Sequence, residues 1–132
     1  MSIVVGYLAT VEGRAALETA GLEAERRGES LVVVVNERLD ETPEQRQDTE
    51  QALEQVRAGL SDRGIEHEIR VIAAGRDVAE ELIGAAEDTD ASMIVIGLRR
   101  RSPVGKLILG ANAQRILLDA PCPVLAVKPD PS

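Results

Sequence analysis

The chain has 132 residues, 44% of them hydrophobic, and this length and composition favour one folded domain over two domains or a disordered chain. Its 23 acidic and 15 basic residues give a net charge of −8, which excludes a general binder of nucleic acid or of anionic membranes. The charge is uneven, because residues 97–128 carry +5 and residues 1–96 carry −12. An acidic surface with few lysines also suits a cytoplasm of high salt.

The compartment is predicted from what the sequence lacks. Cys122 is the single cysteine, so no intrachain disulfide can form, which fits a reducing environment. The apolar start at Ile3–Val5 is too short for a secretory signal, and no stretch approaches the roughly 18 to 20 apolar residues of a membrane span. We therefore expect a soluble, cytoplasmic protein.

Five short runs rich in β-branched residues predict strands. Four of them are almost continuously apolar, which is typical of strands buried on both faces of a parallel sheet, whereas the third alternates and indicates a more exposed position. In chain order the runs are Ile3–Val5, Leu31–Val35, Ile65–Ile72, Met93–Ile96 and Val124–Val127.

Helical patterns fill the intervals between these runs. Thr42, Pro43 and Gln45 form a capping box with proline at the first helical position, and Gly64 is a suitable end for that helix. Asp77 predicts a second capped start, with an end at residues 88–90. The remaining two helices are expected at residues 13–27 and 111–118.

The resulting order, βαβαβαβαβ, predicts a single α/β domain over residues 1–132, with a doubly wound, Rossmann-like sheet of five parallel strands flanked by four helices. In such a sheet, ligands bind in the crevice outside the carboxyl ends of the strands, where the direction of winding reverses. Any binding site is therefore expected at that crevice.

The side chains for enzymatic chemistry are few. The only histidine, His67, is expected to point to the same face of its strand as Ile65 and Ile69. This favours a position at the edge of the core over the role of a catalytic base. Cys122 lies between two prolines, where packing is its expected role. No catalytic residue and no metal ligand is assigned, so any enzymatic turnover is expected to be slow.

Phosphate binding needs only backbone N–H groups at a glycine-bearing loop that leads into a helix. The segment from Gly97 to Asn112 has that form. A dinucleotide fingerprint is excluded, since the sequence after the first strand lacks G-x-G-x-x-G. A P-loop is excluded because Arg100 stands five positions before Gly105 and Leu107 replaces the required Ser or Thr.

The same segment resembles the late signature of the universal stress protein family, G-x2-G-x9-G-[S/T], with Gly97 and Gly110 at its first and last glycines. The ending Ala120-Pro-Cys-Pro-Val-Leu-Ala-Val127 and the run from Asp90 into the fourth strand are also similar to the family. The resemblance covers almost the whole chain. It implies the βαβαβαβαβ fold and, in nucleotide-binding members, an ATP site.

The resemblance also implies the roles of individual residues, and three positions depart from the pattern. Arg100 takes the place of the middle glycine, Ala111 that of the phosphate-binding hydroxyl, and Leu8 that of the ribose-binding aspartate, whereas Val35 matches the strand end that touches adenine. Arg99 and Arg100 could replace lost phosphate contacts by charge-assisted bonds. The arginine run is equally typical of a solvated loop in an acidic protein.

The last strand, with Val124, Leu125, Ala126 and Val127, is apolar and would expose an unpaired edge if it lay at the side of the sheet, as the resemblance implies. Antiparallel pairing with a second copy would cover it, and family members form such dimers. The alternative is a buried strand in a monomer.

The leading hypothesis is a stress-response regulatory homodimer that binds an adenine nucleotide, ATP with Mg²⁺, between the first and fourth strands. A second hypothesis is an interaction module of the same fold that binds no nucleotide and docks to partner proteins. A third is an enzyme that hydrolyses or transfers nucleotides. The nucleotide-binding residues of the leading hypothesis are Leu8, Val35, Gly97, Arg99, Arg100, Gly110, Ala111 and Asn112.

Overall fold

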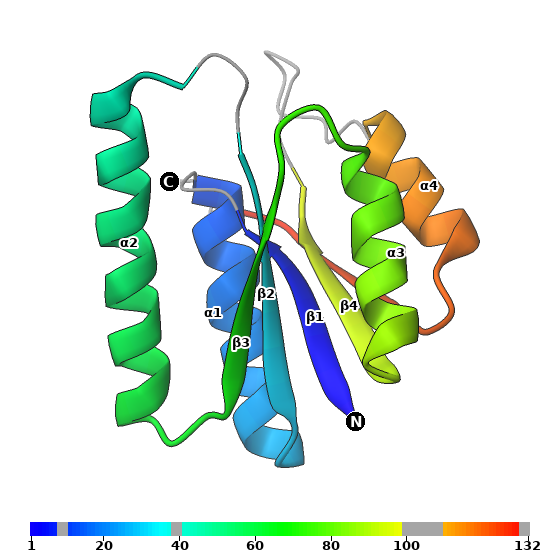
Figure 1. The fold of residues 1–132 in the computed structure, drawn as a ribbon. Coiled ribbons are helices and arrows are strands. Elements are labelled where there is room, and N and C mark those ends of the chain that lie inside the picture. The colour runs from blue at the N-terminus through cyan, green and yellow to red at the C-terminus, as the bar shows by residue number, and fades with distance from the viewer. Residues whose placement is uncertain (8–10, 38–40, 99–109, 130–132) are drawn as a thin grey trace.

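The structure, a computed structural model, describes residues 1–7, 11–37, 41–98 and 110–129. Strands and helices alternate along these residues in the predicted order (Figure 1). The strands are β1 (Ser2–Tyr7), β2 (Ser30–Asn36), β3 (His67–Ile72), β4 (Ala91–Gly97) and β5 (Val124–Val127). The helices are α1 (Val11–Arg27), α2 (Pro43–Asp62), α3 (Val78–Asp88) and α4 (Ala111–Asp119).

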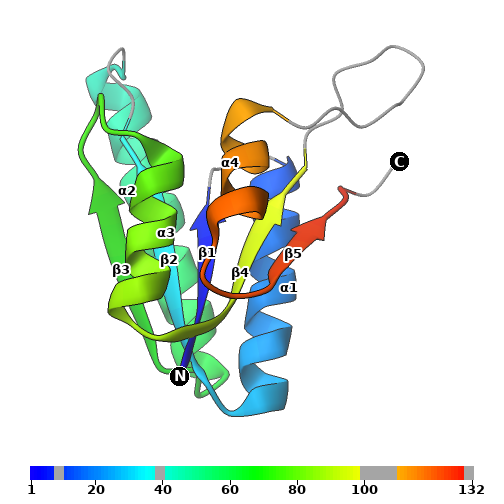
Figure 2. The same cartoon turned by 90° about the vertical axis from the view of Figure 1, so that its right-hand side faces the viewer.

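All the strand pairs are parallel, and the strand order is β3-β2-β1-β4-β5. The chain winds outward from β1 to β3, returns to β4 on the other side of β1 and continues to β5. This confirms the predicted doubly wound α/β fold, with the winding reversed between β1 and β4. Helices α1 and α2 cover one face of the sheet, and α3 and α4 cover the other (Figures 1 and 2).

Each face of the sheet has its own core, because successive side chains of a strand point to opposite faces. Val5, Val33 and Val95 lie in the core under α1, whereas Val4, Val34 and Ile94 lie in the core under α3 and α4. The three central strands are therefore buried on both sides. This is why their sequences are continuously apolar.

The predicted helix starts are confirmed in detail. Thr42 and Gln45 cap each other's backbone N–H groups, and the Asp77 carboxylate accepts a hydrogen bond from the Glu80 N–H. Gly64 follows α2 with a φ of +70°, a conformation that glycine adopts without a steric penalty. Capping therefore determines where both helices begin and where α2 ends.

Strand β3 lies at one edge of the sheet, which confirms the more exposed position predicted for residues 65–72. It begins at His67 because the Ile65 N–H still bonds the Leu60 carbonyl at the end of α2. His67 is half-buried, as predicted, and its Nδ1 lies 3.0 Å from the Ile65 carbonyl. Val71, by contrast, is 52% exposed, although Ile72 on the other face of the strand is buried in the core under α3 and α4. The core on the α1 side therefore does not extend to the far end of this edge strand.

Strand β5 lies at the opposite edge, as predicted (Figure 2). The carbonyls of Pro123 and Val127 accept hydrogen bonds from the N–H groups of Ile94 and Leu98. Backbone groups alternate in direction along a strand, so Val124 and Ala126 direct their N–H and C=O groups away from β4. All four residues of β5 are half-buried.

Candidate functional site

A cavity of about 290 Å³ lies at the carboxyl ends of the strands, on the face covered by α3 and α4. It sits at the point where the winding reverses, which is the position that the fold predicts for a ligand. Its volume is close to the lower end of the range for small-molecule sites, about 300 to 1,000 Å³. The lining residues are Gly6, Tyr7, Val34, Asn36, Ile72, Val78, Leu82, Ile96, Gly97, Asn112, Ala113 and Ile116.

Gly97 at the end of β4 is required by a contact on the other face of the sheet. A Cβ at this position would lie 2.3 Å from the backbone carbonyl oxygen of Glu12, in the first turn of α1. No real Cβ tolerates that distance, so the glycine allows α1 to pack against the end of β4. Gly97 thus borders the cavity while its missing side chain makes room for α1.

The start of α4 borders the same cavity through Asn112. The residue before the helix, Gly110, is extended and supplies no side-chain cap. Ala111 has no hydroxyl group, so neither side chain accepts a hydrogen bond from the first N–H groups of α4. The exposed N–H groups and the helix dipole make this helix start suitable for an anion.

Arg115 fixes the start of α4 against the start of α3. Its guanidinium donates to the Asp77 carboxylate and also lies 3.7 Å from Glu80. The bond from Arg115 holds the pKa of Asp77 below its ordinary value, and Asp77 in turn raises the pKa of Arg115. Because Asp77 also caps α3, one carboxylate ties together the two helices on this side of the cavity.

Asn36, the last residue of β2, contributes an unusual polar atom. Alternate residues of a strand point to the same face, so the Asn36 side chain lies on the α3 side of the sheet with those of Val32 and Val34. Its Oδ1 atom is buried, and it has no hydrogen-bond partner among the residues that the structure describes. Leaving a buried acceptor unpaired is costly, so such an atom needs a specific explanation.

The structure brings some of the predicted site residues together. Gly97 and Asn112 line the cavity, and Gly110 and Ala111 precede Asn112 at the start of α4. The Val35 side chain lies instead in the core on the α1 side, while its neighbours Val34 and Asn36 line the cavity.

Leu8, Arg99 and Arg100 lie outside the described residues. Sequence reasoning missed Asn36 and Tyr7, although a polar residue that ends an apolar strand was a usable signal.

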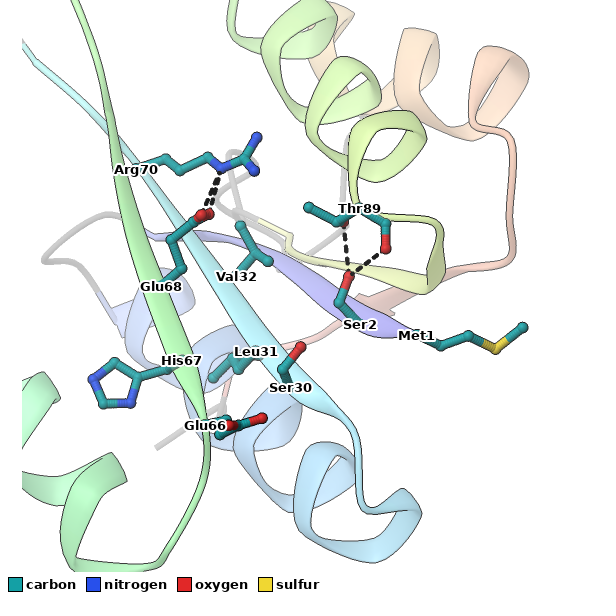
Figure 3. A pocket seen from close by; sticks show the side chains of 10 residues that line it. All are labelled: Met1, Ser2, Ser30, Leu31, Val32, Glu66, His67, Glu68, Arg70 and Thr89. Atoms are coloured by element: carbon teal, nitrogen blue, oxygen red, sulfur yellow. Dashed lines mark hydrogen bonds and ion pairs between the residues drawn. The ribbon is translucent and has the colours of Figure 1, made fainter.

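A second cavity, of about 430 Å³, lies at the amino ends of β1, β2 and β3 (Figure 3). Its polar groups bond one another: the Ser2 hydroxyl lies 2.7 Å from the Thr89 hydroxyl, and the Arg70 Nε lies 2.8 Å from Glu68. Arg70 also bonds Asp88 at 2.9 Å, and its carboxylate partners raise its pKa. Figure 3 marks the bonds of Ser2 with Thr89 and of Glu68 with Arg70, so these polar groups have partners, in contrast to the unpaired acceptor at the carboxyl end.

Cys122 is half-buried and packs against the core under α3 and α4, as predicted. Burial raises the pKa of its thiol, which lowers the fraction of reactive thiolate. No group of three or more His, Cys, Asp or Glu side chains is arranged to hold a metal ion within the described ranges. The helices in these ranges also include none that is long and apolar enough to cross a membrane.

The fold and the cavity define a doubly wound α/β protein with a cavity where the winding reverses, and comparison with known proteins identifies the family. The profile of the universal stress protein family matches residues 1–128. A universal stress protein from Mycolicibacterium smegmatis is 47% identical over 127 residues, which cover 96% of this chain and 97% of the relative. The chain belongs to the universal stress protein family.

Solved structures of universal stress proteins agree with this assignment. One from Archaeoglobus fulgidus has a TM-score of 0.77 and 30% identity, with 96% of this chain and 97% of that chain covered. A structure of a universal stress protein from Archaeoglobus fulgidus in complex with dAMP has a TM-score of 0.72 at 25% identity, with 96% of both chains covered. The fold is therefore that of the family, and one structural relative carries an adenine nucleotide.

Proposed function

We propose that this protein is a regulatory protein of the stress response that binds an adenine nucleotide, ATP, in the cavity between β1 and β4. The observation that carries the proposal is the position of the cavity, at the point where the winding reverses and beside the exposed N–H groups of α4. The dAMP complex of the Archaeoglobus fulgidus relative supports the ligand class.

The residues at the cavity fit a nucleotide better than a metal. Exposed N–H groups at the start of α4 and the Asn112 amide suit phosphate oxygens, and the apolar walls from Val34, Ile72 and Leu82 suit a base. The described lining contains no carboxylate. Mg²⁺ would then arrive with the nucleotide, held by the phosphates and water rather than by protein ligands.

The proposed role is sensing rather than rapid turnover. A general base for water attack would be a His, Asp or Glu side chain near the phosphates, and the described lining of the cavity supplies none. We therefore expect a bound nucleotide to persist, in a protein that acts in the cytoplasm. The third hypothesis, a nucleotide-hydrolysing or transferring enzyme, has no support in these residues.

The direct test is mass spectrometry of the small molecules that the purified protein releases on denaturation, followed by titration with ATP and Mg²⁺ at low and at high salt. Release of an adenine nucleotide, or binding below millimolar ATP, is the expected result. A protein that releases no nucleotide and does not bind millimolar ATP at either salt concentration refutes the proposal.

A variant that restores the family pattern sharpens this test. Arg100→Gly with Ala111→Ser returns the middle glycine and the phosphate-binding hydroxyl, and the added hydroxyl can donate to a phosphate at the start of α4. ATP affinity is expected to rise about tenfold, since one further bond to a charged group contributes roughly 1.5 kcal/mol. Gly84→Ser, which adds a hydroxyl to α3 at a position outside the cavity lining with no atom within 4 Å of the new Cβ, is the control and leaves affinity unchanged.

The alternative function is an interaction module of the same fold that docks to partner proteins without a nucleotide. Ala111, which removes the family's hydroxyl at the start of α4, favours it, as do the exposed side chains of Leu117 and Leu118 on the same helix. Leu8 and Arg100 also depart from the family pattern. Failure of both nucleotide experiments above, with the fold intact, selects this function.

The proposed homodimer forms through β5. This strand is an apolar sheet edge whose Val124 and Ala126 backbone groups point away from β4. Pairing with the β5 of a second copy, antiparallel and two-fold symmetric, satisfies those groups and covers the half-buried side chains. Sedimentation at micromolar protein distinguishes the dimer from a monomer.

A further inference from the structure

We infer that Asn36 determines which base the site accepts: its buried side-chain oxygen receives a hydrogen bond from the exocyclic amino group of adenine. The inference rests on the proposed nucleotide function and adds to it a residue that selects adenine over a base with a carbonyl at the same position. It starts from the one buried side-chain oxygen without a partner among the described residues.

The geometry of the sheet places Asn36 at the base end of a bound nucleotide. The start of α4, which suits the phosphates, adjoins β4, and Asn36 ends β2; β1 lies between these two strands. Neighbouring strands are about 4.8 Å apart, so the phosphate end and Asn36 are separated by about 10 Å across the strand tips. A nucleotide laid across them puts phosphate near α4, ribose over β1 and base over β2.

The environment of Asn36 explains why a base must supply the missing bond. Val34 precedes it on the same face, and Ile72 pairs with it on β3, so the surrounding wall is apolar. An acceptor in such a wall loses its hydration and gains nothing in return until a donor arrives. Adenine presents an N–H donor at its exocyclic position, whereas hypoxanthine presents a carbonyl oxygen there, which cannot bond the Asn36 oxygen unless the amide turns over. The preference for adenine therefore belongs to the amide orientation seen in the structure.

The side chain of Asn36 is also costly to the free protein, which distinguishes a binding residue from a structural one. Polar groups that stabilise the fold have partners, such as the Thr89 hydroxyl, which bonds Ser2 and donates to the Ala85 carbonyl at 2.8 Å. Asn36 has none for its Oδ1 in the described part of the chain. Replacing Asn36 with leucine, a residue of similar size, should stabilise the free protein and weaken the ligand.

The experiment titrates ATP and ITP into the wild type and into Asn36→Leu by calorimetry, and records the melting temperatures without ligand. We expect the wild type to prefer ATP about tenfold, and Asn36→Leu to lose about that factor in ATP affinity and to bind the two nucleotides equally. Its melting temperature without ligand should rise by roughly 2 to 5 °C. Thr89→Val is the matched control, which melts lower and keeps the preference for ATP.

The outcomes separate the two proposals. A wild type that binds neither nucleotide refutes the proposed function and, with it, the role of Asn36. A wild type that binds ATP, together with an Asn36→Leu variant that retains the wild-type preference, overturns the role of Asn36 alone and leaves the nucleotide site standing. An Asn36→Leu variant that melts below the wild type also overturns it, since a destabilised variant means that Asn36 serves the fold.

Discussion

The two edges of the sheet protect their exposed backbone in different ways. Strand β3 carries Glu68 and Arg70, which bond each other, and Arg70 also ties the strand to Asp88, the last residue of α3. Such charges discourage pairing with another sheet. Strand β5 consists of four uncharged apolar residues, all half-buried. The charges of β3 disfavour pairing with another sheet, whereas the apolar edge of β5 favours it, and this difference supports the proposed dimer.

Breaking β5 as a pairing edge should have the largest effect. Ala126→Pro removes an N–H that points away from β4, so the bonds to β4 stay intact while antiparallel pairing with a second copy is lost. We expect the dissociation constant of the dimer to rise at least about 100-fold, because both copies lose a backbone bond and meet a proline ring. Analytical ultracentrifugation measures the change.

Ala126→Val is the control for that variant, because it keeps the N–H and leaves the dimer in place. A dimer that survives Ala126→Pro contradicts pairing through β5 and directs attention to another surface, such as the exposed leucines of α4.

Gly97→Ala tests whether the position of β5 at the edge depends on the close packing of α1 against β4. Gly97 pairs with Val127, and Val127 packs on the core under α1. Since the new Cβ would meet a backbone carbonyl at 2.3 Å, α1 must move, and we expect the free energy of unfolding to fall by about 1 to 3 kcal/mol. Denaturant unfolding of the protein measures this loss.

Gly84→Ala is the matched control, because a Cβ at that helical position in α3 meets no atom within 4 Å. That change should stabilise the protein by roughly 0.5 to 1 kcal/mol, through the higher helix propensity of alanine. Equal losses from both substitutions would argue against the close contact between β4 and α1.

Removing the charges of β3 should have the smallest effect on folding. The double variant Glu68→Val with Arg70→Val removes exposed ion pairs, which contribute little to stability, so the unfolding curve should hardly change. Its edge then resembles that of β5, and we expect association beyond the dimer at high concentration, measured by light scattering. A variant that stays dimeric shows that the charges do not protect this edge.

Much of the fold was predictable because its signals are local. The Thr42 capping box, the Asp77 cap and the apolar strands follow from rules that act within a few residues, and the structure confirms them. The position of the cavity, at the point where the direction of winding reverses, followed from topology alone. The ends of β3 and the exposure of Val71 were not predictable, because they depend on how far the core extends toward the edge of the sheet.

The details of the candidate site depend on contacts between distant parts of the chain. The sequence pattern assigned Gly97 to phosphate approach, but its conflict with the Glu12 carbonyl becomes visible only when α1 is packed on β4. Val35 and Asn36 are adjacent in sequence, yet strand parity sends their side chains to opposite faces. Asn36 was not singled out, because the missing partner of its oxygen is a property of the packed structure.

Tyr7 gives the cavity a built-in optical signal. The protein has no tryptophan and no phenylalanine, so this tyrosine is its only aromatic side chain. The residue is 5% exposed, and its side chain belongs to the core under α1, beside the groove between α1 and α2. Tyr7 also borders the cavity at the end of β1. The near-ultraviolet emission of the chain therefore originates next to the candidate site, and we expect it to change when that site is occupied in unlabelled protein.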